Sequence, residues 1–230
     1  MLKNYRKERF LALTGNEFHR ITYYEWGNPN SDRTLICLHG LTRNGRDFDF
    51  LARNLQHRFR IICPDMPGRG FSYSLKNKQN YLFEHYAAQI AQLIIRLRLE
   101  SVDLLGTSMG GVTALMLASI YNSPVNRLIM NDVGVFVPGF IFKAIRETVN
   151  NRPHAFATLE EAAGFIRDYM KTFGPMTDEM ISEIIRHSVR QMPDGHLEMN
   201  FDPDIVTPYM MEEPEDLDLR DAWRQIKCPT

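Results

Sequence analysis

Short apolar runs alternate with helical repeats of apolar residues over the first 131 positions. Runs such as 34–38 have the length of a strand and the unbroken apolar character of a parallel strand buried on both faces. The pattern predicts strands at 34–38, 59–63, 101–105 and 127–130, helices at 48–55, 81–97 and 112–118, and one or two antiparallel strands within 10–26. Strands that alternate with helices form βαβ units. The expected fold class is therefore α/β, with a mostly parallel sheet flanked by helices.

The alternation ends after Pro138, and a helical region follows. Residues 140–192 predict three helices, two of which open with capping signals at Thr158 and Thr177. The rest of the pattern gives a turn at 193–195, a short extended piece reaching Phe201, a Pro- and acid-rich linker at 208–218 and a short helix at 221–226. Because helices inserted on the ligand side of a sheet form a cap, the expected divisions are a core at 1–137, a helical cap at 138–212 and a return to the core at 213–230.

Polar residues gather where the predicted strands end. His39-Gly40-Leu41 follows the first buried strand, and Gly68-Arg69-Gly70 lies in the loop after the second. Ser108 and Asp132 follow the next two. Since ligands bind at the carboxyl ends of strands in open α/β sheets, these positions are expected to converge on one site.

Ser108 lies in the pattern Gly106-x-Ser108-x-Gly110, between an apolar strand and an apolar helix. That setting is typical of a nucleophile elbow, a strained turn whose neighbouring positions must be nearly free of side chains. Serine needs a base to become nucleophilic and N–H donors for the oxyanion that its attack creates. The backbone N–H groups of Met109 and Leu41 are the expected donors.

Composition and charge exclude several other functions. The 230 residues carry a net charge of −1 with both signs interspersed, so no footprint for nucleic acid is present. No window resembles a membrane span or a signal peptide, which favours a cytoplasmic protein without a membrane partner. Cys37, Cys63 and Cys228 fit neither a zinc site nor a disulfide framework and are expected to be reduced. No cofactor or metal is expected, and the oligomeric state stays open.

The motifs together resemble the α/β-hydrolase superfamily, in particular its small soluble serine hydrolases with a helical cap. The matching segments are His39-Gly40, Asp65-Met66-Pro67-Gly68-Arg69-Gly70-Phe71-Ser72, Gly106-Thr107-Ser108-Met109-Gly110-Gly111 and Asn131-Asp132-Val133-Gly134, in the family's order. The resemblance implies an acyl-enzyme on Ser108 that water then hydrolyses, without a cofactor. It also implies that His39 orders the oxyanion loop.

The chain departs from the family pattern at its C-terminal end. In the family, a strand that begins near Lys227 leads to the catalytic aspartate, and a further strand leads to the catalytic histidine. The C-terminal strands and both partners of Ser108 are therefore expected beyond Thr230. Asp132 is an alternative acid, although a polar strand-end role explains it more simply. His187 and His196 complete the order Ser, Asp, His only formally, because both belong to the cap.

Two hypotheses remain open at this point. In the first, the protein hydrolyses an ester, lactone or related carbonyl substrate through Ser108, with His39, Gly40, Arg43 and Arg69 as pocket-lining candidates. The two arginines are candidate ligands for a substrate carboxylate, against the simpler interpretation of solvated loop residues. In the second, the chain is a truncated or non-catalytic protein of the same fold that retains only a small-molecule pocket.

Overall fold

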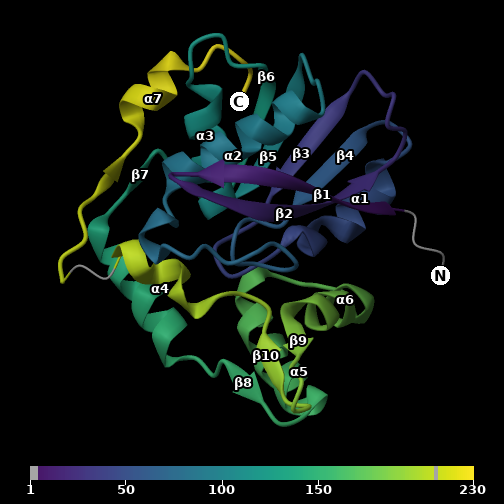
Figure 1. Ribbon diagram of the computed structural model, residues 1–230, viewed down its shortest axis with the longest axis vertical. Coiled ribbons are helices and arrows are strands. Elements are labelled where there is room, and N and C mark those ends of the chain that lie inside the picture. Colours follow the sequence, from purple (N-terminus) through teal and green to yellow (C-terminus); the bar gives the residue numbers. More distant parts are fainter. Residues whose placement is uncertain (1–4, 210–211) are drawn as a thin grey trace.

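The computed structural model describes residues 5–209 and 212–230, and its centre is a six-stranded sheet (Figure 1). The strand order is β1-β2-β4-β3-β5-β6. The bounds are β1 (Tyr5–Thr14), β2 (Glu17–Trp26), β3 (Thr34–Leu38), β4 (Arg60–Pro64), β5 (Val102–Thr107) and β6 (Val125–Asn131). β1 and β2 form an antiparallel hairpin, and β3 to β6 run parallel. The predicted α/β class with a mostly parallel sheet is confirmed.

The sheet is apolar on both faces because each central strand sends alternate side chains to opposite layers. Ile36 and Leu38 of β3 belong to the larger core cluster, which includes side chains of α2 (Phe83–Arg96) and α3 (Met109–Ala118). Leu35 and Cys37 belong to the other cluster, with side chains of α1 (Asp49–Leu55). This double burial explains the unbroken apolar runs in the sequence.

Residues 139–209 form a second, smaller body below the sheet in Figure 1, here called the helical segment. It contains α4 (Gly139–Asn151), α5 (Leu159–Met170) and α6 (Asp178–Ser188), in agreement with the three expected helices. It also contains a small antiparallel sheet of order β8-β10-β9. The bounds are β8 (Ala155–Phe156), β9 (Val189–Gln191) and β10 (Leu197–Met199). Of these strands, only the region of β10 was expected from the sequence. Four 3₁₀ turns complete the described chain, at Gly45–Phe48, Lys78–Asn80, Lys171–Phe173 and Pro203–Tyr209.

Two short strands mark the point where the chain leaves the sheet and returns to it. β7 (Phe136–Val137) pairs with β11 (Leu217–Asp218). The expected linker at 208–218 is therefore wrong at both ends, because its first two residues belong to the 3₁₀ turn Pro203–Tyr209 and its last two to β11. Residues 210–211 of that linker lie outside the described residues. After α7 (Arg220–Gln225), the N–H of Leu128 in β6 donates to Pro229 O at 3.0 Å, and the chain therefore meets the sheet again beside β6.

Candidate active site

Ser108 lies at the junction of β5 and α3 with a backbone conformation that non-glycine residues rarely adopt. Its φ is 52° and its ψ is −116°. The Ser108 N–H donates to Asn131 O at 2.9 Å, which ties the turn to the end of β6. A Cβ on Gly106 would lie 2.2 Å from Gly110 O, and one on Gly110 would lie 2.1 Å from Leu38 O. Only glycine fits at either position, so the local sequence forces the strained turn that the elbow pattern predicts.

Hydrogen bonds to Gly40 O fix the loop after β3. Gly40 O accepts hydrogen bonds from the His39 ring at 2.7 Å and from the Arg43 N–H at 3.1 Å. The Leu41 N–H belongs to the same trans peptide and therefore points the opposite way. Neither this N–H nor that of Met109 has an acceptor among the described residues, and a Cβ on Gly40 would lie 4.0 Å from Ser108 Cβ. Their role as oxyanion donors stays a prediction.

His39 is a fixed, neutral part of this loop. Its Nε2 accepts from the Met66 N–H at 2.9 Å, so Nδ1 carries the proton that is donated to Gly40 O. The side chain is 1% exposed, and burial lowers its pKa to about 3. A ring that is saturated with backbone partners and uncharged at neutral pH orders the loop and cannot accept the serine proton. The pocket-lining expectation for His39 is corrected, because this buried side chain does not line the cavity that contains Ser108.

A cavity of about 250 Å³ opens in front of Ser108. Ser108, Met109, Leu41 and Asp132 all line it. Its other lining residues are predominantly apolar: Phe83, Val112, Val133, Gly134, Phe136, Val137, Pro138, Ile141, Phe142 and Ile145. A cleft with apolar walls and a few convergent polar groups is the usual form of a small-molecule site.

The α4 contribution to this cavity was not expected from the sequence. Ile141, Phe142 and Ile145 follow one another at helical spacing and form one apolar stripe of α4. The apolar stripe could have been recognised from the sequence. Its helical spacing does not show, however, which part of the protein the stripe packs against. Phe142 also packs against Phe83 of α2, with ring centroids 6.4 Å apart.

Arg43 and Arg69 do not line this cavity, contrary to the sequence-based expectation. Arg43 is 8% exposed and pairs with Asp47 through two hydrogen bonds of 2.7 and 2.6 Å, while its Nη1 donates to Ser188 Oγ. Arg69 is 0% exposed and is surrounded by protein acceptors. Both guanidinium groups are buried and hydrogen-bonded to other residues of the protein, so neither is accessible to a substrate carboxylate. Gly40 lies beside Ser108 but also does not line the cavity.

The structure separates the remaining acid and base candidates. Asp132, with φ of 56°, lines the same cavity as Ser108, so its acid role stays a prediction. His187 is on α6, where burial lowers its pKa to about 4. His196, between β9 and β10, pairs with Asp194 and Glu198, which raise its pKa. No histidine of the described residues lines the Ser108 cavity.

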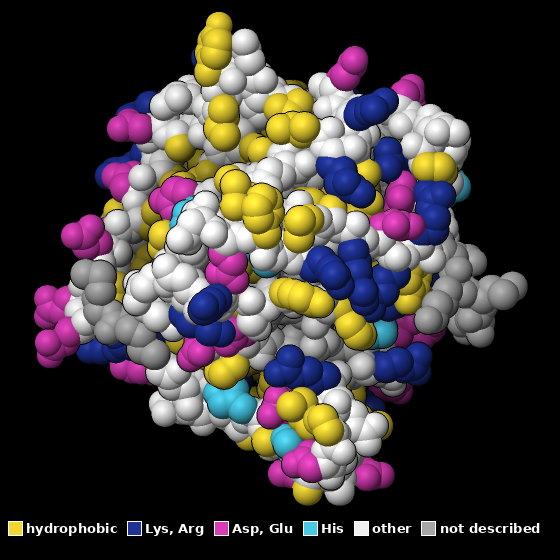
Figure 2. Space-filling view, viewed as in Figure 1, with side chains coloured by type: hydrophobic (Ala, Val, Ile, Leu, Met, Phe, Trp, Pro, Cys, Tyr) yellow, Lys and Arg dark blue, Asp and Glu magenta, His cyan; other side chains and the backbone are white. Residues whose placement is uncertain are grey.

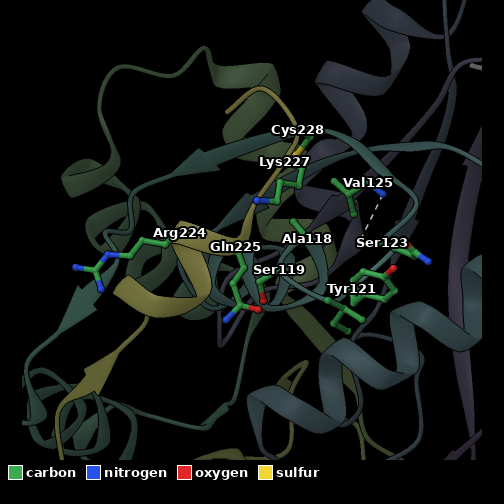
Figure 3. Close-up of a pocket in the computed structure, with 11 residues that line it drawn as sticks. Ala118, Ser119, Tyr121, Ser123, Val125, Arg224, Gln225, Lys227 and Cys228 are labelled. Atoms are coloured by element: carbon green, nitrogen blue, oxygen red, sulfur yellow. Dashed lines mark hydrogen bonds between the residues drawn. The ribbon is translucent and has the colours of Figure 1, made fainter.

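A larger cavity of about 500 Å³ lies between the end of α3 and α7 (Figure 3). Arg224, at its rim, points away from the hollow and pairs with Asp221. Cys228 lines it, but partial burial raises the pKa of that thiol, which disfavours the nucleophilic thiolate. The smaller cavity is therefore the candidate active site, because it alone of the two joins a strained serine to free N–H donors.

The described part of the chain offers few other kinds of site. Within residues 5–209 and 212–230, no three His, Cys, Asp or Glu side chains are placed to hold a metal ion. The helices described there are all too short or too polar to cross a membrane. Figure 2 shows Lys, Arg, Asp and Glu side chains interspersed over one face of the molecule.

Comparison with known proteins shows the class to which this fold and site belong. The model of the α/β hydrolase fold family matches residues 33–175, so the chain belongs to that family and is an enzyme of the hydrolase type. Among individual proteins, the chain is 37% identical over 216 residues to the 3-hydroxybutyrate-oligomer hydrolase of Cupriavidus necator. That match covers 91% of this chain and 73% of the relative.

Solved structures agree with the sequence matches. A protein from Rickettsia typhi is 31% identical, with a TM-score of 0.84 over 98% of this chain and 78% of that one. An α/β hydrolase from Novosphingobium aromaticivorans is 26% identical, with a TM-score of 0.79 over 93% and 73% of the two chains. The parallel sheet and its helices are therefore shared with structures of this family.

Proposed function

We propose that the protein hydrolyses short carboxylic esters through an acyl-enzyme on Ser108, with oligomers of a hydroxy acid as the first substrates to test. The observation that carries the proposal is the strained Ser108 turn, which lines an apolar cavity together with Leu41 and Met109, whose backbone N–H groups have no acceptor among the described residues. The 3-hydroxybutyrate-oligomer hydrolase similarity supports the ester class. The helical segment would act as the cap, because α4 supplies part of the cavity wall.

In the proposed reaction, Ser108 Oγ attacks the ester carbonyl, and its proton passes to a base. The carbonyl oxygen becomes an oxyanion that accepts from the Leu41 and Met109 N–H groups. Collapse of this intermediate breaks the C–O bond and releases the alcohol, which takes up a proton. Water then attacks the acyl-enzyme in the same way and releases the acid.

The experiment is labelling with a fluorophosphonate probe and mass-spectrometric mapping of the modified residue. Wild-type protein should be labelled on Ser108 and should hydrolyse 4-nitrophenyl butyrate and the 3-hydroxybutyrate dimer. Ser108→Ala should do neither, while Ser119→Ala, at the far end of α3, should behave as wild type. Folded wild-type protein that is neither labelled nor active would contradict the proposal.

The second candidate is a non-catalytic protein that binds a small apolar molecule in the same cavity. The observation that favours it is the lack of a histidine in the Ser108 cavity among the described residues. Under this candidate, short-chain esters such as ethyl butyrate would bind, as measured by calorimetry, without turnover and without labelling of Ser108.

A further inference from the structure

We infer that Arg69 is a positioning residue for catalysis, a buried cation that fixes both halves of the oxyanion hole and places a positive charge behind it. The inference rests on the proposed function of Ser108. The side chain starts in the loop after β4 and contacts Leu41 and Met109, the two residues whose N–H groups are the proposed oxyanion donors.

The contacts of the guanidinium join three separate segments of the chain. Nε donates to Leu41 O at 2.8 Å, and Nη2 lies 3.5 Å from the Met109 sulfur. Nη1 donates to Pro67 O at 2.6 Å and to Tyr86 Oη at 2.9 Å. The planar fork of arginine suits this task, because it reaches several acceptors in fixed directions. Leu41 and Met109 are thereby held through one rigid group.

The acceptors around Arg69 are all neutral. The side chain is 0% exposed, and no carboxylate of the described residues lies within 4.0 Å of its nitrogen atoms. The rings of Tyr81 and Tyr86 lie 5.4 and 5.2 Å from the guanidinium carbon, and Tyr81 Oη donates to Asp202 Oδ2 at 2.7 Å. A buried charge without a carboxylate in direct contact is costly, so a fold that retains one is expected to use it.

The charge of Arg69 reaches the groups around it. Burial is the larger cause of the low pKa of His39, and the Arg69 charge lowers that pKa further. Burial raises the pKa of Tyr86, and the same charge opposes the rise. The positive field therefore extends to the His39 loop, where the proposed oxyanion forms. A pre-set charge in a dry site stabilises a developing anion more than it would in water.

The test compares rate constants for phosphonylation of Ser108 at saturating fluorophosphonate. In this reaction a P–O bond forms at Ser108, the P–F bond breaks, and the serine proton leaves to the base or to water. Arg69→Met should lower the maximal rate constant at least about ten-fold, less than the ~100-fold typical of a lost oxyanion donor. The probe concentration at half-maximal rate should stay within about two-fold, because the cavity wall is unchanged.

Tyr86→Phe is the matched control. It removes the Tyr86 hydroxyl, which is a buried partner of the Arg69 guanidinium, but leaves the Leu41 and Met109 contacts in place. The rate constant for labelling of this variant should therefore stay within about two-fold of wild type, even if its melting temperature falls. Arg69→Lys keeps the charge without the fork and should recover part of the rate lost in Arg69→Met. If Arg69→Met does not fold, Arg69→Lys carries the test against wild type, with an expected loss of a few-fold.

The outcomes separate this inference from the proposed function. If wild type is labelled on Ser108 and the folded Arg69 variants react as fast as wild type, the inference is overturned and the proposed function stands. An equal rate loss in Tyr86→Phe would also overturn it, because general packing would then explain the effect. Folded wild-type protein without labelling would overturn both.

Discussion

The neutral state of His39 makes the stability of the protein depend on pH in a way that one substitution can isolate. The ring is 1% exposed and donates to Gly40 O while it accepts from the Met66 N–H. Protonation would place a second N–H against the Met66 N–H, so the folded state resists it. Burial is the main cause that lowers the pKa of His39 from 6.5 to about 3.

The sign and size of the effect follow from proton linkage. Between pH 6.5 and 3 the unfolded chain binds a proton at this position and the folded chain does not, so the stability from His39 is complete above pH 6.5 and is lost as the pH falls toward 3. Each pH unit within this window corresponds to about 1.4 kcal/mol. At pH 5 the expected loss is therefore about 2 kcal/mol, a large share of the stability of a single domain.

Urea unfolding of wild type and of His39→Gln at pH 7.5, 6 and 5 measures the contribution of His39 to the free energy of unfolding. The Gln amide oxygen can still accept from the Met66 N–H, but the position no longer titrates. At pH 7.5 the variant should be less stable by about 1 kcal/mol or more, because the bond to Gly40 O is lost. Between pH 7.5 and 5, wild type should lose about 2 kcal/mol more than the variant.

Other titrating groups are present in both proteins and cancel in this comparison. Burial raises the pKa of Asp65 to about 6, so its contribution has the opposite sign: it is present below pH 3.8 and lost as the pH rises through 6. His187, with its pKa near 4, has the same sign as His39 and makes a useful second variant. Parallel stability curves for wild type and His39→Gln would refute the buried, neutral description of His39.

Three further predictions concern packing and one ion pair. Gly110→Ala should lower the free energy of unfolding in urea by more than about 2 kcal/mol and abolish labelling of Ser108, because its Cβ would lie 2.1 Å from the carbonyl oxygen of Leu38 in β3. The control Gly164→Ala has no atom within 4 Å of its Cβ, so its stability should be unchanged or slightly higher. Phe142→Ala should shift the best substrate among 4-nitrophenyl esters toward longer acyl chains, since it enlarges the cavity; an unchanged chain-length profile would contradict this. Arg53→Met, which breaks the two 2.6 Å hydrogen bonds to Glu183, should cost no more than about 1 kcal/mol in the same unfolding assay.

The elements around Ser108 could be predicted because their signals are local. An apolar run, a glycine-flanked serine and an apolar helix lie within eighteen consecutive residues, 101–118. The requirement for glycine at 106 and 110 follows from the turn itself. The parallel sheet could be predicted for a related reason, since burial on both faces leaves a continuous apolar run that needs no knowledge of the partner strand.

Beyond the extended piece at β10, the small sheet of the helical segment could not be predicted, because its strands are too short to carry a pattern. β8 has two residues, and β9 and β10 have three each. Two or three residues give no usable alternation, and the pairing of Leu197 with Phe156 joins positions about forty residues apart. Such pairs form because the surrounding helices bring them together, which is tertiary information.

The two arginines were misplaced for a related reason. A charged residue in a polar loop is exposed by default, and burial becomes acceptable only when the fold supplies acceptors. The acceptors of Arg69 come from Leu41, Pro67 and Tyr86, and the main partner of Arg43 is Asp47. Sequence spacing reveals the Arg43–Asp47 pair as i,i+4 neighbours, but it cannot show that Arg69 lies beneath the serine turn.

The buried polar side chains behind Ser108 share one physical origin. The loops after β3 and β4 are irregular apart from one β-bridge between Arg69 and Phe201, so many of their backbone groups need acceptors and donors from side chains. His39 bridges Gly40 O and the Met66 N–H, and Asp65 accepts from the backbone N–H groups of Gly45 and Phe71 at 2.8 Å each. Arg69 holds Leu41 O in the same way. Polar residues are buried here because irregular backbone must be satisfied without water, and the loops that face the serine are therefore fixed before any substrate arrives.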